Sequence, residues 1–151
     1  MTRPRPMGLL AALLLALAAL PASAAERLVG RARAIDGDGV AVAGIAMRLQ
    51  GVVAPEIAHP ELGIEEEPGG PEAAAFLARL VNGRTLICEL TGERTHGRLV
   101  GVCHVDGQDV GAAVIAAGLA RDCPRFSRGR YAELETAAGR RLPLPGYCTT
   151  R

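Results

Sequence analysis

Residues 35–56 read IDGDGVAVAGIAMRLQGVVAPE, and this stretch decides how the rest of the chain is interpreted. It holds a turn-forming Asp36-Gly37-Asp38-Gly39 sequence, an arginine at position 48 in an apolar segment, and Pro55-Glu56 at its end. Arginine presents paired donors that suit phosphate, glutamate can take a proton from water, and aspartate can hold a divalent cation. The stretch, together with Gly97-Arg98 further along, therefore predicts chemistry on a phosphodiester.

The apolar pattern around this stretch predicts a meander of three short strands. Residues 27–35 alternate loosely, residues 40–42 follow the Asp-Gly turn, and residues 46–50 follow a turn at Gly44. A loop over 54–70 comes next, with three prolines and a run of three glutamates that we interpret as a solvated face. Loops of this length are usually functional or mobile.

The second half of the chain predicts three helices and two more strands. A proline favours the first turn of a helix, and Asn-Gly favours its end. The predicted elements are a helix from Pro71 to Asn82-Gly83, strands over 85–90 and 99–105, a helix marked by Val110, Val114 and Ile115 and stopped by Gly118, and a short helix over Tyr131–Ala138.

Residues 1–24 have the character of a secretion signal. A basic start precedes an apolar run from Gly8 to Leu20, and Ala22-Ser23-Ala24 supplies small residues for cleavage. The run is shorter than the roughly 20 apolar residues of a membrane span, although a signal anchor remains the alternative. We expect cleavage before Ala25, a secreted or periplasmic protein, and one domain over residues 25–151.

The charge balance of the mature chain limits its partners. Removing Arg3 and Arg5 from the 17 basic residues leaves 15, against 16 acidic residues. Such a chain has no general surface for a polyanion, so any contact with nucleic acid must come from a local cluster.

The four cysteines, Cys88, Cys103, Cys123 and Cys148, all lie in the segment expected to be exported. An even count in an oxidising compartment favours two disulfides over a metal site. Four cysteines allow three pairings. The strands that carry Cys88 and Cys103 should pair antiparallel because their connection is short, which lets these two cysteines face each other. The other two would then clip the C-terminal tail to the second helical region.

Taken in order, these motifs resemble the staphylococcal nuclease (thermonuclease-like) family. The matching residues are Asp36-Gly37-Asp38, Arg48-Leu49, Pro55-Glu56, His59-Pro60, Gly63, Gly70-Pro71-Glu72-Ala73, Gly97-Arg98, Asp106-Gly107 and Gly118-Leu119-Ala120. The resemblance implies a mainly β fold with α elements: a five-stranded OB-fold barrel plus three helices.

The resemblance also implies a catalytic site. Arg48, Glu56 and Arg98 match the family's catalytic positions, and Asp38 matches a calcium carboxylate. In such a site the glutamate positions or deprotonates the attacking water, while the arginines bind the phosphate and stabilise the charge that develops on its oxygens.

The calcium site departs from the family pattern. Val53 stands where the family has its second calcium carboxylate, and it offers no side-chain oxygen, although the Ala54 carbonyl remains. Calcium binding follows the number and charge of its ligands, so we expect Ca²⁺ to bind weakly or not at all. His96 replaces a common tyrosine before Gly-Arg and is either a substrate-binding residue that stacks on a base or sugar, or an ordinary loop residue.

Each site residue also has a structural interpretation. Asp36 and Asp38 are common turn formers, Arg48 could form an ion pair with Glu56, and Arg98 could be an ordinary surface arginine.

Two functions remain open at this point. The first is a secreted thermonuclease-like phosphodiesterase that cleaves DNA or RNA with a weakened or altered calcium dependence. The alternative is a non-catalytic OB-fold module that binds a phosphate-bearing ligand or a protein partner, since the fold hosts both kinds of site. In either case we expect a monomer with no stable membrane association once the signal is removed.

Overall fold

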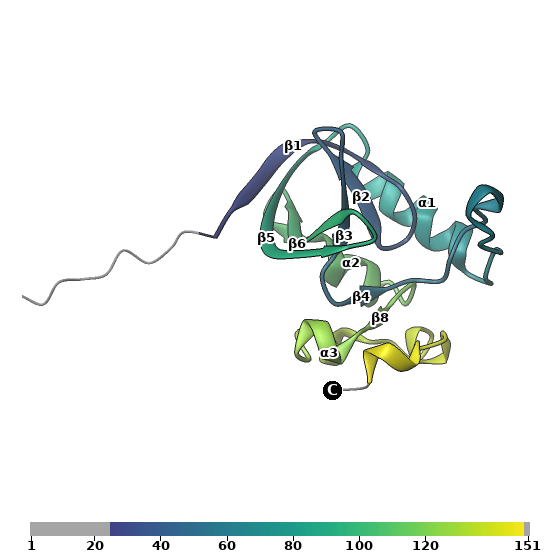
Figure 1. Ribbon diagram of the computed structural model, residues 1–151. Helices are drawn as coiled ribbons and strands as arrows, with labels where there is room; N and C mark the ends of the chain where they lie inside the picture. The colour runs from purple at the N-terminus through teal and green to yellow at the C-terminus, as the bar shows by residue number, and fades with distance from the viewer. Residues whose placement is uncertain (1–24, 150–151) are drawn as a thin grey trace, which may run out of the picture.

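A closed five-stranded barrel forms the body of the molecule, as the computed structural model shows for residues 25–149 (Figure 1). The strand order is β3-β2-β1-β5-β6, and parallel pairing of β3 with β6 closes the barrel. Its strands are β1 (Arg27–Ala34), β2 (Gly39–Val42), β3 (Ile45–Leu49), β5 (Thr85–Thr95) and β6 (Arg98–Val105). The fold expected from the sequence is confirmed. The signal predicted at residues 1–24 lies outside the described residues.

Short elements complete the barrel and its surroundings. Strand β7 extends the sheet beside β6, and β4 pairs antiparallel with β8 away from the barrel. The remaining bounds are β4 (Val52–Val53), α1 (Gly70–Val81), β7 (Gln108–Asp109), α2 (Val110–Ala116), β8 (Arg121–Asp122), α3 (Pro124–Ser127), and 3-10 turns at Pro60–Leu62, Ala132–Leu134, Gly139–Arg141 and Gly146–Cys148.

Helix α1 forms where the sequence predicts it. Pro71 lies in its first turn, where a missing N–H costs nothing, and Asn82 ends it with its N–H donating to the Ala78 carbonyl. Its inner face buries Ala73, Leu77 and Val81 against the barrel. The barrel core is mostly small and aliphatic, with Met47, Leu49, Leu77, Leu86 and Ile115 as its largest fully buried side chains.

The third helix lies earlier in the chain than the sequence predicts. Residues 131–138 were expected to be helical, but α3 spans Pro124–Ser127 and the later segment forms only a 3-10 turn. Tertiary contacts explain the difference. The Tyr131 hydroxyl donates to the Asp109 carboxylate. Glu135 is extended, and its side chain accepts from Arg121 and from the Asp122 N–H. These contacts outweigh the weak helical preference of the segment.

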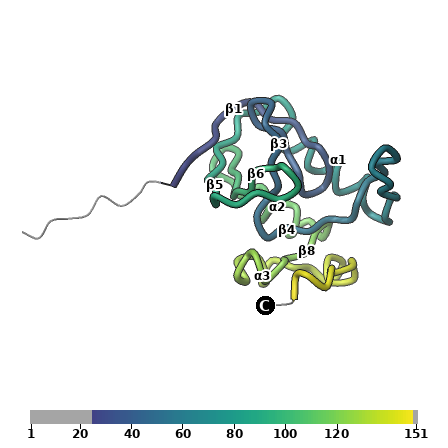
Figure 2. The backbone as a smooth tube through the Cα atoms, viewed as in Figure 1, coloured from purple at the N-terminus to yellow at the C-terminus, as the bar shows by residue number. Residues whose placement is uncertain are grey.

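Both predicted disulfides are present. Cys88 and Cys103 face each other as cross-strand partners in β5 and β6, and Cys123 joins Cys148 across 25 residues. The second bond holds the C-terminal segment beside β4 and β8 (Figure 2). Two disulfides indicate an oxidising, extracytoplasmic compartment. Within residues 25–149, no helix is long and apolar enough to cross a bilayer.

Candidate functional site

The Asp36–Gly39 turn between β1 and β2 is the base of the site. The Asp36 carboxylate accepts a hydrogen bond from the Asp38 N–H at 3.0 Å, and the Ile35 N–H donates to the Gly39 carbonyl at 2.9 Å. A Cβ atom on Gly37 would lie 2.6 Å from the Cβ of Ala54 and 2.7 Å from that of Ala73. Glycine is therefore needed here to let the turn approach both α1 and the segment that leads to Glu56.

Arg48 reaches this turn from β3. Its register places it opposite Gly39 in β2 and Val100 in β6, so both neighbouring strands fix its position. Its Nη2 donates to Asp38 Oδ2 at 3.3 Å, and the same oxygen accepts from the Ala54 N–H at 3.0 Å. The ion pair with Glu56 that the sequence allowed is not formed, because the nearer carboxylate is that of Asp38.

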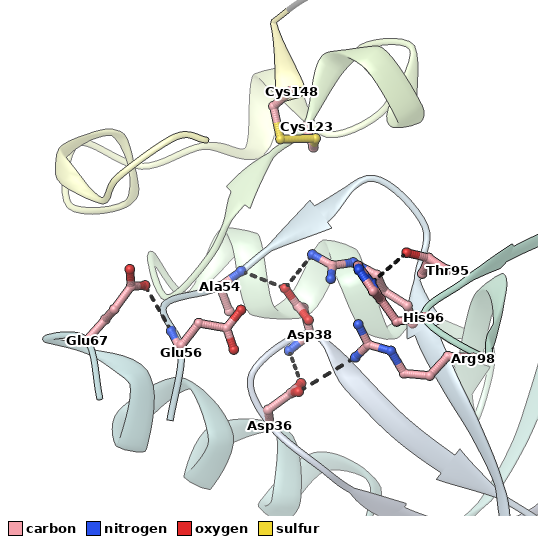
Figure 3. Close-up of polar contacts among 11 residues, drawn as sticks. Asp36, Asp38, Ala54, Glu56, Glu67, Thr95, His96, Arg98, Cys123 and Cys148 are labelled. Atoms are coloured by element: carbon pink, nitrogen blue, oxygen red, sulfur yellow. Dashed lines mark hydrogen bonds and ion pairs between the residues drawn. A yellow bond between two sulfur atoms is a disulfide. The ribbon is translucent and has the colours of Figure 1, made fainter. Parts of the chain in front are cut away.

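Arg98 reaches the same turn from the start of β6. It follows a tight hairpin turn at His96-Gly97, where φ is 47° and 77°, the left-handed conformation that such turns require. Its Nη1 lies 3.9 Å from Asp36 Oδ2. Arg98 is therefore not an isolated surface arginine: two strands deliver two guanidiniums to two neighbouring aspartates (Figure 3).

Glu56 lies across from these pairs. Its N–H donates to Glu67 Oε2 at 3.0 Å, which ties one glutamate of the acidic run to the site. Its carboxylate points toward the side where Asp36, Asp38 and Arg98 lie (Figure 3). Burial is the main cause that raises the pKa of Glu56; Asp36 raises it further, while Arg48 and Arg98 oppose the shift. The three predicted catalytic residues thus influence one another electrostatically.

Negative charge is in excess at the site, where three carboxylates face two guanidiniums. Burial raises the pKa of Asp38 to about 6, because loss of water outweighs the opposing effect of Arg48, and Asp36 and Glu56 add to the rise. Burial alone would lower the pKa of Arg48, but the neighbouring acidic groups, led by Asp38, raise it. A bound cation or proton would relieve this excess.

Val53 is turned away from the site. It is only 5% exposed and packs with Cys123, Cys148 and Leu144, the cluster formed where the C-terminal segment is clipped to β4. Successive side chains of an extended strand point to opposite faces, so Val52 packs in the barrel core while Val53 belongs to a separate apolar cluster. The next residue, Ala54, donates its backbone N–H to Asp38. Val53 thus offers no ligand oxygen, as the sequence predicts, and it has a packing role that the sequence did not reveal.

The residues present do not fit a calcium site of the family type. Calcium takes about 6–8 oxygen ligands. Val53 supplies no side-chain oxygen, and Asp38 Oδ2 is already shared by Arg48 and the Ala54 N–H. Across residues 25–149, no three acidic, histidine or cysteine side chains gather as a metal-binding group. The role of Asp38 as a calcium ligand stays a prediction.

His96 and a pocket next to Arg48 complete the site. The His96 ring lies 3.2 Å from the Thr95 hydroxyl and lines a pocket that also contains Arg48, Phe126 and Tyr147. Its assignment to substrate binding stays a prediction. Sequence analysis missed the two aromatic residues. The predicted Cys123–Cys148 bond was the signal that could have placed them together, because Phe126 follows one of these cysteines closely and Tyr147 precedes the other.

Comparison with known proteins supports the resemblance. Residues 46–140 match the family described as staphylococcal nuclease homologue. The chain belongs to this family. It is also 37% identical over 121 residues to the succinoglycan biosynthesis protein ExoI of Rhizobium meliloti (strain 1021). That match covers 78% of this chain and 63% of the relative, so the chain spans less than two thirds of the relative's length.

Proposed function

We propose that this nuclease homologue is a phosphodiesterase that cleaves DNA or RNA and depends little on calcium. The observation that carries the proposal is the convergence of Arg48 and Arg98, from two strands of the closed barrel, on one turn that Glu56 also faces. Each guanidinium uses one nitrogen in the contact with an aspartate, which leaves the other N–H groups of its fork for phosphate oxygens. Both side chains are about one-fifth exposed, so a ligand can reach them.

The chemistry proposed is hydrolysis by an activated water. Glu56 accepts a proton from water, the water oxygen forms a bond to phosphorus, and the bond from phosphorus to the leaving oxygen breaks. The leaving oxygen takes a proton from solvent, which gives a phosphate monoester and an alcohol. Arg48 and Arg98 stabilise the charge on the phosphoryl oxygens. A raised pKa makes Glu56 a stronger base than an ordinary glutamate, provided that it is ionised when substrate binds.

A specific observation favours a second candidate, a non-catalytic module that binds a phosphate-bearing ligand or a protein partner. Both arginines already have aspartate partners, and the position of the family's second metal carboxylate is committed to packing against a disulfide. The relative named as a succinoglycan biosynthesis protein also supports a role other than nucleic-acid degradation. In this case the same forks would hold the ligand without turning it over.

A nuclease assay on the purified protein without residues 1–24 separates the two candidates. Single-stranded DNA, single-stranded RNA and duplex DNA are each incubated over a calcium series and with a chelator. For the phosphodiesterase, cleavage persists in chelator, and Glu56→Gln or Arg98→Ala lowers the rate about 10²–10³-fold while leaving the fold intact.

The matched controls are Glu89→Gln and Arg84→Ala, because these residues form exposed ion pairs elsewhere on the barrel, with Arg27 and Asp106. Both controls should cleave like the original protein. Cleavage that requires calcium would reject the weak dependence proposed here. A folded protein that binds phosphate-bearing ligands through Arg48 and Arg98 but cleaves none of them would establish the binding module instead.

A further inference from the structure

The pocket beside Arg48 has dimensions and chemistry that the proposed catalytic groups do not account for. Its volume is about 590 Å³, within the range of small-molecule sites. Four parts of the fold form its wall: β3, the tip of the β5–β6 hairpin, α3 and the C-terminal segment. Arg48, Arg94 and Arg125 line it, against Glu93 in the lining and Asp38 paired with Arg48 behind it. Positive charge therefore exceeds negative charge on this side of Arg48 and favours an anionic ligand.

Two aromatic side chains form one wall of this pocket. Phe126 is 39% exposed and Tyr147 is 47% exposed, with ring centroids 6.4 Å apart and planes tilted by 54°. The Arg125 guanidinium lies 5.4 Å from the Phe126 centroid. The chain has only two Phe, two Tyr and no Trp, and the other two rings pack into or against the core. Two of the four aromatic rings therefore lie at an exposed wall, where they contribute little to core packing. This placement needs a reason other than stability.

Tyr147 also lies close to the proposed phosphate-binding group. Arg48 and Tyr147 line the same pocket, and Tyr147 is among the groups that raise the pKa of Arg48. A nucleotide whose phosphate lies on Arg48 can therefore extend its nucleoside into the pocket that the Tyr147 ring lines. The pocket thus places a phosphate-binding guanidinium, that of Arg48, next to two rings on which a base can stack, Phe126 and Tyr147.

The C-terminal disulfide holds the Phe126 and Tyr147 rings in place. Tyr147 is adjacent to Cys148, which is bonded to Cys123, and α3 with Phe126 begins directly after Cys123. One covalent bond therefore fixes both rings relative to the barrel. Tyr147 lies beyond residues 46–140, the part of the chain that matches the family. The wall is thus partly built from a segment that the family comparison does not describe.

We propose that Tyr147, held by the Cys123–Cys148 disulfide, is a substrate-binding residue that stacks with the base of the nucleotide whose phosphate lies on Arg48. The inference rests on the proposed function, because it takes a nucleic-acid strand as the ligand. Bases can enter such a pocket only where they are not stacked in a duplex, so the ligand is a single strand.

The test measures binding of a short fluorescent single-stranded oligonucleotide by anisotropy, at one fixed salt concentration, in a Glu56→Gln background that prevents cleavage. A second probe has the same phosphates but abasic sugars. Stacking of one base on an aromatic ring makes Tyr147→Ala bind the normal probe about 5- to 100-fold more weakly. Tyr147→Phe, which retains the ring, restores the affinity, and Leu62→Ala, which removes an exposed apolar side chain elsewhere, leaves it unchanged.

The abasic probe separates stacking from a structural role. The protein with Tyr147 should prefer the normal probe, and Tyr147→Ala should lose that preference. If Tyr147→Ala weakens both probes equally, or neither, the inference is wrong. Binding that is lost in Arg48→Ala but not in Tyr147→Ala would reject the stacking role and leave the proposed function intact. If the folded protein binds neither probe, the nucleic-acid ligand itself is rejected, and the inference with it.

Discussion

Val53 and Ala54 are neighbours in the chain but belong to two different regions of the molecule. Ala54 serves the polar end of the barrel, where its N–H donates to Asp38 at 3.0 Å. Val53 serves the apolar cluster with Cys123, Cys148 and Leu144. The first region holds Arg48, Glu56 and Arg98, which the resemblance assigns to catalysis. The second holds Val53, which packs against a disulfide at the position where the resemblance predicts a metal carboxylate.

The two regions are held together by different means. Strand pairing fixes the polar end, because Arg48 and Arg98 lie in strands with partners on the barrel. The C-terminal segment contributes only the two-residue strand β8, the four-residue helix α3 and short 3-10 turns, and a disulfide ties it down. Val53 belongs to the second region, where its buried side chain contributes to packing. Its substitution should therefore be judged first by its effect on folding.

The largest effect is expected for Val53→Asp. The change introduces the carboxylate that the resemblance predicts for calcium, but it puts an unpaired carboxylate into an apolar cluster. We expect the free energy of unfolding to fall by about 3–5 kcal/mol. Urea unfolding with both disulfides intact measures the change. Val29→Asp is the matched control, because Val29 is 54% exposed on the barrel surface, and it should cost much less.

A stable, calcium-binding variant would contradict the assignment of Val53 to the apolar region. A Val53→Asp protein that is as stable as the original and binds calcium in a calorimetric titration would show that position 53 still serves the polar end. Its side chain would then have to turn out of the cluster formed by Cys123, Cys148 and Leu144. The weak calcium dependence that we propose for the original chain would then be reversible by one substitution.

The second effect concerns the two disulfides. Replacing either pair by alanine should cost about 2–4 kcal/mol, since the closed loops span 15 and 25 residues. The two variants should differ in which amides exchange faster. Without Cys123–Cys148, amide exchange should accelerate mainly in residues 121–149, whereas loss of Cys88–Cys103 should lower protection throughout the barrel. Uniform acceleration in both variants would show that the C-terminal segment is not a separate region.

The sequence predicted the individual strands from local signals and periodicity, and the family resemblance predicted the closed barrel and the residues at its polar end. Arg48 lies in one of these strands, and Arg98 follows the turn at His96-Gly97. The Cys88–Cys103 bond followed from antiparallel pairing. For this disulfide, a short-range pattern determines the long-range contact.

The C-terminal segment was harder to predict because its structure depends on tertiary contacts. The residues expected to form a helix after Tyr131 are instead held by side-chain hydrogen bonds from Tyr131 to Asp109 and from Arg121 to Glu135. The burial of Val53 likewise depends on which segment covers β4. Neither contact has a signature in periodicity or turn chemistry.

The smallest effect concerns Asp122, which lies in β8 at the boundary between the two regions. Its side chain is buried, and neither carboxylate oxygen has a hydrogen-bond partner of normal geometry in the described part of the chain. Burial is the main cause that raises its pKa. The nearby Ser127 hydroxyl and Tyr131 N–H lower it, and Glu135 raises it. The folded protein therefore favours the protonated acid more than the unfolded chain does.

The sign of the pH effect follows from this shift. An acid whose folded pKa is raised contributes stability that is complete below its unfolded pKa and is lost as pH rises through the folded pKa. Asp122→Asn keeps the shape and removes the charge, so it should match the original protein in acid and exceed it modestly near neutral pH. Thermal unfolding across the acid-to-neutral range measures the difference, with Asp106→Asn as the exposed control. If Asp122→Asn is less stable near neutral pH, the Asp122 carboxylate must be ionised and bound by neighbouring groups. The junction between the barrel and its C-terminal segment would then be stabilised by this charge.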